Sequence, residues 1–131
     1  MNTIRILLVD DNPMFLGITR EFLQLQVELT VVGAAHNGRE ALVQAEKLKP
    51  DVILLDLNMP GLSGLETIPK LQKITPQAKI IALTMMNQEA YQPAALAAGA
   101  DGFVAKGSMG AELVTTIQRV VKETGQPEQE R

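Results

Sequence analysis

Two adjacent carboxylates follow an apolar run near the start of the chain, in the stretch "ILLVDDN" at residues 6–12. Like charges side by side repel, and burying them is costly unless a partner compensates. One interpretation is a strand that runs out into a turn, because Asp and Asn favour turns and helix caps. The other is a metal site, because clustered carboxylates are stable around a hard cation and oxygen ligands suit Mg²⁺.

Further reactive side chains stand at the ends of later apolar segments: Asp56, Thr84 and Lys106. Each of them alone is compatible with an ordinary turn, cap or surface charge. A metal-bound carboxylate keeps its charge at neutral pH and can act as a nucleophile towards a phosphoryl group. Phosphoryl transfer otherwise needs positioning and charge neutralisation, which Mg²⁺, Lys106 and the Thr84 hydroxyl would supply. The pattern predicts phosphoryl transfer to Asp56, with Asp10 and Asp11 holding the metal.

The elements that would position these residues alternate along the chain. Apolar runs predict strands at 4–9, 29–35, 52–55, 79–83 and 102–105, while three- and four-residue apolar spacing predicts helices. The helices are expected from residue 13 onwards and at 38–48, 65–74, 90–98 and 109–123. Five strand–helix units in succession imply an α/β fold, a doubly wound parallel sheet with right-handed crossovers. Sites in such sheets lie at the carboxyl ends of the strands.

Within these helices the sequence makes finer predictions. Asn12 is expected to cap the first helix and Pro13 to occupy its first position. Pro93 lies inside the fourth helix and removes a main-chain donor, so a late start or a kink is expected there. The apolar residues expected to recur at helical spacing are Phe15, Ile18, Phe22 and Leu25 in the first helix, Ala41, Leu42 and Ala45 in the second, and Leu113, Ile117, Val120 and Val121 in the last. Ala94, Ala95, Leu96 and Ala97 cannot all face the sheet, since a helix turns about 100° per residue.

Composition excludes several classes of protein. A chain of 131 residues is expected to form one domain, and 46% hydrophobic with 21% charged residues is typical of a globular protein. The absence of cysteine excludes disulfides, thiolate catalysis and cysteine metal sites. A net charge of -3 argues against a nucleic-acid-binding surface. No apolar run approaches the roughly 20 residues of a membrane helix and no signal peptide is recognisable, so a soluble cytoplasmic domain is expected.

The motifs "LLVDDNP", "LLDLNMPGLSG", "IIALTMM" and "GADGFVAKG", spread over residues 3–122, resemble the receiver domain of bacterial two-component response regulators. The resemblance implies a flavodoxin-like five-stranded sheet in the order 2-1-3-4-5, with five helices covering both faces. It implies a receiver domain at 1–124 and a disordered tail or linker stub at 125–131.

Carried over by position, the resemblance implies a role for each polar residue at the strand ends. Asp56 would be the phosphoacceptor, Lys106 the lysine that pairs with the phosphate, and Thr84 the switch hydroxyl that turns towards it. Phe103 matches the aromatic switch position, and simple packing in the fifth strand is compatible with that role. The Mg²⁺ ligands would be Asp10, Asp11, Asp56 and the main-chain carbonyl of Asn58.

The resemblance also implies partners and an output. The donor would be a histidine kinase or a histidine phosphotransfer protein, and a homodimer would form through the fourth helix, fifth strand and last helix. Gly107 replaces the Pro common in the family, as in receivers of helix–turn–helix regulators, which implies transcription regulation with DNA bound only through a domain that this chain lacks. His36 is expected at the surface. Bulky Met85 stands where many receivers have a small residue and is expected to restrict access, with simple packing as the alternative.

Three alternatives stay open beside this interpretation. The first is a stand-alone receiver that acts through protein contacts, without membrane association. The second is an enzyme, an aspartate-nucleophile phosphatase, but Asn58 stands where such enzymes carry a second acid. The third is a flavin-binding protein, for which the chain has one Tyr and no Trp to stack against the ring. A signalling domain, and not an enzyme, is therefore the expectation.

Overall fold

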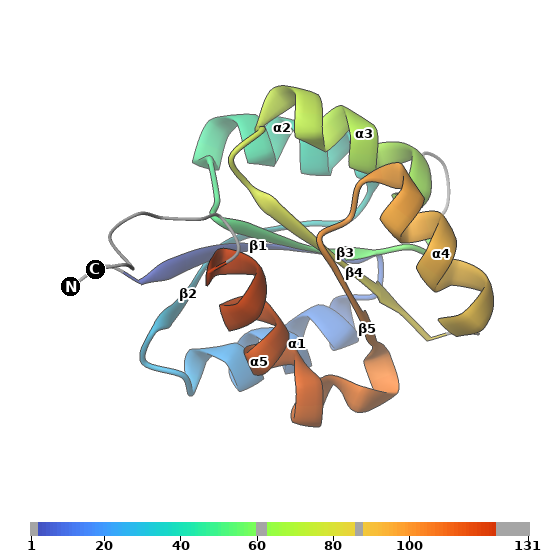
Figure 1. The fold of residues 1–131 in the computed structure, drawn as a ribbon. Coiled ribbons are helices and arrows are strands. Elements are labelled where there is room, and N and C mark those ends of the chain that lie inside the picture. The colour runs from blue at the N-terminus through green and yellow to red at the C-terminus, as the bar shows by residue number, and fades with distance from the viewer. Residues whose placement is uncertain (1–2, 60–62, 86–87, 123–131) are drawn as a thin grey trace.

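A computed structural model of the chain describes residues 3–59, 63–85 and 88–122. Five parallel strands form one sheet in the order β2-β1-β3-β4-β5, as the resemblance implies (Figure 1). The strands are β1 (Ile4–Val9), β2 (Leu29–Ala35), β3 (Val52–Asp56), β4 (Lys79–Thr84) and β5 (Gly102–Ala105). The helices are α1 (Pro13–Gln24), α2 (Gly38–Leu48), α3 (Gly64–Ile74), α4 (Gln88–Ala98) and α5 (Met109–Lys122), with a 3₁₀ turn, η1 (Lys106–Ser108), before the last.

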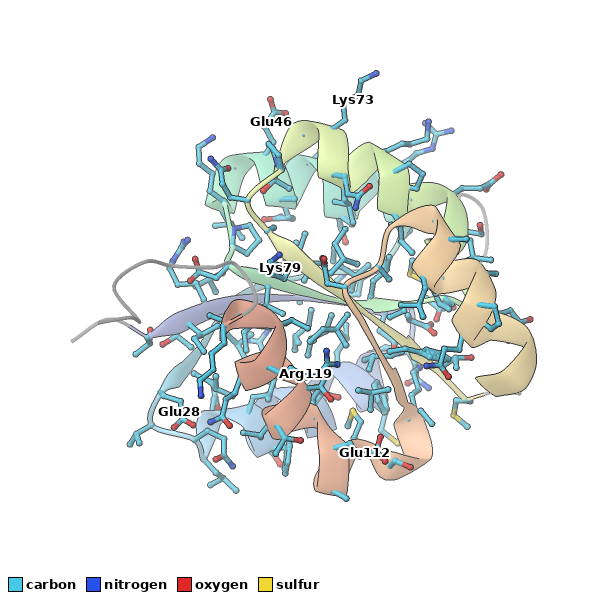
Figure 2. All side chains as sticks on the ribbon, in the orientation of Figure 1. Glu28, Glu46, Lys73, Lys79, Glu112 and Arg119 are labelled. Atoms are coloured by element: carbon cyan, nitrogen blue, oxygen red, sulfur yellow. The ribbon has the colours of Figure 1, made fainter. Side chains whose placement is uncertain are left out.

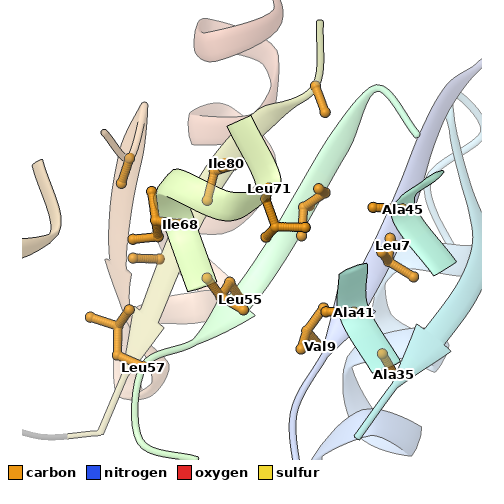
Figure 3. Packing of buried hydrophobic residues seen from close by; sticks show 14 of the residues in the cluster. Leu7, Val9, Ala35, Ala41, Ala45, Leu55, Leu57, Ile68, Leu71 and Ile80 are labelled. Atoms are coloured by element: carbon orange, nitrogen blue, oxygen red, sulfur yellow. The ribbon is translucent and has the colours of Figure 1, made fainter. Parts of the chain in front are cut away.

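The helices cover the two faces of the sheet, with α1 and α5 on one face and α2, α3 and α4 on the other (Figure 1). Successive strand residues point to opposite faces, so each strand contributes to two cores. Figure 3 shows the core under α3, where Ile68 and Leu71 pack over Leu55 and Ile80. Charged side chains such as Glu46 on α2 point away from the sheet in Figure 2.

Two strands extend one residue further than their apolar runs predict. Asp56 pairs with Leu83 in the ladder between β3 and β4, and Thr84 pairs with Ala105 in the ladder between β4 and β5. Main-chain pairing with the neighbouring strand, which a hydropathy pattern does not record, extends both strands. The polar residues at 56 and 84 are therefore held by the sheet itself.

The buried stripe of the first helix coincides only in part with the apolar spacing seen in the sequence. The buried residues are Leu16, Thr19 and Leu23, whereas Ile18 is 55% exposed and Leu25 is 80% exposed. Three residues at steps of three and four lie on one stripe, and Ile18 then falls on the opposite side of the helix. Leu25 lies beyond the last helical residue. Of the four residues at helical spacing, Phe15 and Phe22 are partly buried against the core on this face of the sheet, while Ile18 and Leu25 face solvent.

The fourth helix starts at Gln88 and runs through Pro93, so the late start that Pro93 suggested was wrong. Proline removes one main-chain donor, but the remaining residues keep theirs, and Ala95 packs into the core. Ala94, Leu96 and Ala97 face solvent, which confirms that this run cannot all face the sheet. In α2 and α5 the expected residues lie inward: Ala41, Ala45, Leu113, Ile117 and Val120 are buried, and Leu42 and Val121 are partly buried.

The connections at the carboxyl edge are held by specific local contacts. Ser63 caps α3 and, together with Glu66, forms a capping box, so the helix begins at Gly64, one residue earlier than predicted. A Cβ added at Gly64 would lie 2.5 Å from the Leu57 Cα and 2.6 Å from the Asp56 carbonyl oxygen. Only glycine allows this approach of the helix to the end of β3. The 125–131 tail and Glu123 lie outside the described residues.

Candidate functional site

Three carboxylates converge at the carboxyl edge of the sheet. Asp10 and Asp11 follow β1 and Asp56 ends β3, and these strands are paired neighbours in the same direction. Each of the three carboxylates offers an oxygen that lies within 4.8 Å of the others. Asp10 and Asp56 are buried, while Asp11 faces solvent. They line a hollow of about 420 Å³ that opens at the surface, together with Asn12, Asn58, Met85 and Lys106.

Lys106 brings a positive charge to the carboxylates from the end of β5, the outermost strand beyond β3 and β4. It follows β5 as the first residue of η1, and its side chain is only 9% exposed. Its Nζ lies 2.7 Å from Asp10 Oδ2 and 3.5 Å from Asp56 Oδ1. The predicted meeting of these strand-end residues is therefore present in the structure, with the ammonium closest to Asp10.

The electrostatic environment raises the pKa of Asp56 above its ordinary value. Burial is the largest cause, and the negative charges of Asp10 and Asp11 add to it. The Asn58 main-chain N–H, 3.1 Å from Asp56 Oδ1, and the Lys106 ammonium act in the opposite direction. A cation among the carboxylates would remove the repulsion and favour the charged form. The donor set, all oxygen and partly open to water, fits Mg²⁺.

Asn58, just after β3, links the end of this strand to the end of the neighbouring strand β4. The Thr84 hydroxyl donates a hydrogen bond to Asn58 Oδ1 at 2.9 Å, and Thr84 is fully buried at the end of β4. The sequence predicted a role only for the main-chain carbonyl of Asn58 and not for its side chain. Residue spacing carries no signal for this hydrogen bond, because it depends on one rotamer of the asparagine.

The start of α1 is tied directly to the acidic cluster. Asp10 Oδ1 accepts the Asn12 N–H at 2.9 Å, and Asn12 Oδ1 accepts the N–H groups of Met14 and Phe15. The predicted cap at Asn12, with Pro13 as the first helical residue, is confirmed. The cap places the Phe15 ring beside Lys106, whose Nζ lies 4.1 Å from the ring centroid. The sequence analysis assigned Phe15 to packing alone.

The other residues singled out from the sequence lie around this centre. Met85 lines the hollow but is 74% exposed, so it stands on the rim. Phe103 in β5 is half-buried and packs against the core under α2, α3 and α4. Gly107 follows Lys106 within η1. His36 is exposed, as expected, and its Nδ1 lies 2.8 Å from Glu40 Oε1 at the start of α2.

Comparison with known proteins identifies the family. The model of the response regulator receiver domain matches residues 6–118. The nitrate/nitrite response regulator NarL of Escherichia coli is 40% identical over 114 residues, which are 87% of this chain and 53% of NarL. The chemotaxis protein CheY of Thermotoga maritima is 36% identical over 90% of this chain and 98% of CheY. A LuxR-family two-component response regulator from Aurantimonas sp. SI85-9A1 superposes with a TM-score of 0.88 at 33% identity, covering 93% of this chain and 87% of that one.

The family match identifies the doubly wound sheet with its acidic edge as a receiver domain, which is a signalling domain rather than a catalytic enzyme. The chain belongs to the response regulator receiver domain family of two-component systems. Receiver domains bind Mg²⁺ at a cluster of aspartates and interact with histidine kinases. The chain spans about half the length of NarL. Within the described ranges, no helix has the length and apolar character needed to cross a membrane.

Proposed function

We propose that this protein is a phosphorylation-controlled switch that accepts a phosphoryl group on Asp56. The observation that carries the proposal is the buried Asp56 carboxylate, with oxygens of Asp10 and Asp11 within 4.8 Å and the Lys106 ammonium at 3.5 Å. A nucleophilic carboxylate beside a concentrated positive charge is what phosphoryl transfer needs, because the transferred group carries its charge on three oxygens.

The reaction forms one bond and breaks another. An Asp56 carboxylate oxygen attacks the phosphorus of a phosphohistidine, and the P–N bond breaks. The electron pair of that bond stays on the donor imidazole, which takes up a proton as it leaves. The Asn58 N–H, which already donates to Asp56 Oδ1, orients the carboxylate for attack. The Lys106 ammonium neutralises charge on the arriving phosphoryl oxygens.

Asp10, Asp11, Asp56 and the Asn58 main-chain carbonyl would hold Mg²⁺. The bound ion would neutralise charge on the phosphoryl oxygens and thereby lower the barrier to transfer. Since water must complete the octahedron and Mg²⁺ gives up its own water reluctantly, weak affinity is expected.

The response to phosphorylation would begin at Thr84. A phosphoryl group on Asp56 offers the Thr84 hydroxyl a charged acceptor in place of the neutral oxygen of Asn58. Movement of Thr84 then leaves space that Phe103 can occupy, which changes the face formed by α4, β5 and α5. Moving a 1:99 equilibrium to 99:1 requires about 5.5 kcal/mol of differential stabilisation. Several charge-assisted contacts supply energies of this order.

The donor protein, a histidine kinase or a histidine phosphotransfer protein, would dock over α1. Met14 in the first turn of α1 is 74% exposed, and Ile18 lies one turn further along. Met85 stands on the opposite rim of the hollow. Exposed apolar side chains on both sides of a charged hollow fit a partner that delivers a phosphohistidine into it.

Two outputs are compatible with this switch. Similarity to NarL favours the receiver part of a transcriptional regulator, with residues 1–124 as the domain, 125–131 as a linker stub and DNA bound elsewhere. Similarity to CheY is compatible with the alternative, a receiver that acts through protein contacts, including a second copy docked on α4, β5 and α5.

The proposal is tested by phosphorylation with a small donor. Wild-type protein incubated with acetyl phosphate and Mg²⁺ should gain the mass of one phosphoryl group, labile in base, and peptide mapping should locate it at Asp56. Asp56→Asn should gain none, because an amide is not a nucleophile at neutral pH. Labelling of that variant at the wild-type level would contradict the assignment.

A further inference from the structure

We propose that Phe15 is a positioning residue that holds the Lys106 ammonium between Asp10 and Asp56. The proposal rests on the proposed function, because Lys106 matters for phosphoryl transfer only if Asp56 is the acceptor. Its basis is one contact: Lys106 Nζ lies 4.1 Å from the centroid of the Phe15 ring. A cation within about 6 Å of a ring centroid is attracted by the electrons of the ring face.

The Phe15 ring gives the Lys106 ammonium a third contact, beside those with the two carboxylates. A lysine ammonium sits on a flexible four-carbon stem and has no fixed geometry for its partners. Here it lies 2.7 Å from Asp10 but 3.5 Å from Asp56, so only the first contact is close. The Phe15 ring bounds the ammonium on a further side. Because the Lys106 side chain is only 9% exposed, this attraction acts where water screens little.

The ring is itself fixed by the acidic cluster. Asp10 binds Lys106 through one oxygen and the Asn12 N–H through the other. Asn12 in turn caps α1 by accepting the Phe15 N–H at 3.2 Å. Asp10 therefore sets both the position of the ammonium and the position of the helix turn that carries the ring. Phe15 is half-buried, so packing limits its rotation.

This arrangement has a consequence for the rate of transfer. Without an aromatic face, the ammonium is free to spread over more positions, and fewer of them lie where the phosphoryl oxygens arrive. Replacing the ring by an aliphatic side chain should slow phosphorylation of Asp56 by about three- to tenfold. Folding should change no more than after a similar replacement elsewhere on α1.

The experiment compares Phe15→Leu, Phe15→Tyr and a matched control, Phe22→Leu, in the full chain. Phe22 is also half-buried on α1 and packs against the same core, seven residues from Phe15. The first readout is the rate of Asp56 phosphorylation by acetyl phosphate with Mg²⁺. The second is the proton chemical shift of the Lys106 ε-methylene group without metal or phosphodonor, since protons over a ring face are shifted upfield.

The expected result is an upfield Lys106 signal in the wild type, in Phe15→Tyr and in Phe22→Leu, and its loss together with the slower rate in Phe15→Leu alone. A normal phosphorylation rate in Phe15→Leu would overturn the proposal, and so would an equal loss of rate in Phe22→Leu. If no variant and no wild-type sample is labelled at Asp56, the proposed function fails. The chemical shift, measured in the wild type without any phosphodonor, then still decides whether the ring holds the ammonium.

Discussion

Lys106 Nζ is bonded to Asp10 at 2.7 Å and lies 3.5 Å from Asp56, so without metal the lysine sits on a candidate metal ligand. Lys106 and Mg²⁺ therefore compete for Asp10, since both neutralise its negative charge. A cation bound to Asp10 would weaken the contact between the ammonium and this carboxylate. This competition leads to the first prediction.

Lys106→Met should bind Mg²⁺ about three- to tenfold more tightly than the wild type, because a neighbouring positive charge a few ångströms away is removed. The measurement is a Mg²⁺ titration followed by NMR around Asp56. Asp11→Ala serves as the opposite control and should lose most of its affinity. Weaker binding in Lys106→Met would show that the lysine does not compete with the metal.

The raised pKa of Asp56 predicts a stability change with pH. A folded-state pKa above the unfolded value means that Asp56 contributes stability below the ordinary carboxyl pKa of about 4. That contribution is lost as the pH rises through the raised pKa, so at neutral pH the buried charge destabilises the fold. Asp56→Asn should then raise Tm by about 2–8 °C in EDTA, the effect of about 1 kcal/mol in a domain of this size. Thermal unfolding followed by circular dichroism measures it.

The Tm difference between Asp56→Asn and the wild type should disappear near pH 4 and should shrink at pH 7 when Mg²⁺ is added. A difference that is equally large at both pH values would mean that the amide stabilises the fold for another reason.

If the exposed face of α1 binds the kinase, substitutions on it should slow phosphorylation by the kinase but not by acetyl phosphate. Met14→Glu and Ile18→Glu should each lower phosphotransfer from a phosphorylated histidine kinase by about tenfold, because a charge is placed in a desolvated contact. Labelling by acetyl phosphate should stay at the wild-type rate, since neither side chain is part of the acidic cluster. Leu25→Glu is the matched control, because Leu25 is equally apolar and 80% exposed but lies beyond the far end of the helix. An equal loss with both donors would contradict docking on this face.

The hydrogen bond between Thr84 and Asn58 predicts which elements change when a phosphoryl group, or a mimic of it, binds at Asp56. Beryllofluoride with Mg²⁺ mimics the phosphoryl group, so amide hydrogen exchange should change in α4 and β5 more than in α2. Mass spectrometry of peptic peptides measures this response. Thr84→Ala should bind the mimic but lose most of the change in α4 and β5. A response confined to α2 would contradict the proposed route.

The sequence predicts the parts of this protein that depend on order along the chain. Parallel strands end at one edge, so polar residues after apolar runs, such as Asp10, Asp56 and Lys106, had to meet there. The cap at Asn12 was likewise predictable, because it is local. Which apolar residues of α1 are buried could not be predicted, since α1 carries apolar residues on more than one side and only packing chooses between them.

Contacts that depend on a single rotamer left no trace in the sequence. The bond from Thr84 to the Asn58 side chain and the stacking of Phe15 on Lys106 join residues 26 and 91 positions apart. Neither distance in sequence nor residue type distinguishes them from ordinary packing. The start of α4 before Pro93 was also not predictable. Proline in a helix removes one main-chain hydrogen bond, and packing of the whole helix offsets this loss.

Gly64 lies so close to the Asp56 carbonyl oxygen that a Cβ there would be 2.6 Å away. The loop after the acceptor is therefore fixed at both of its ends, at Asp56 and at the first residue of α3. Even the methyl group of an alanine at position 64 would therefore push against the main chain of Asp56 and Leu57. A single small substitution on α3, outside the acidic cluster, should in this way shift the Asp56 carboxylate and slow its phosphorylation.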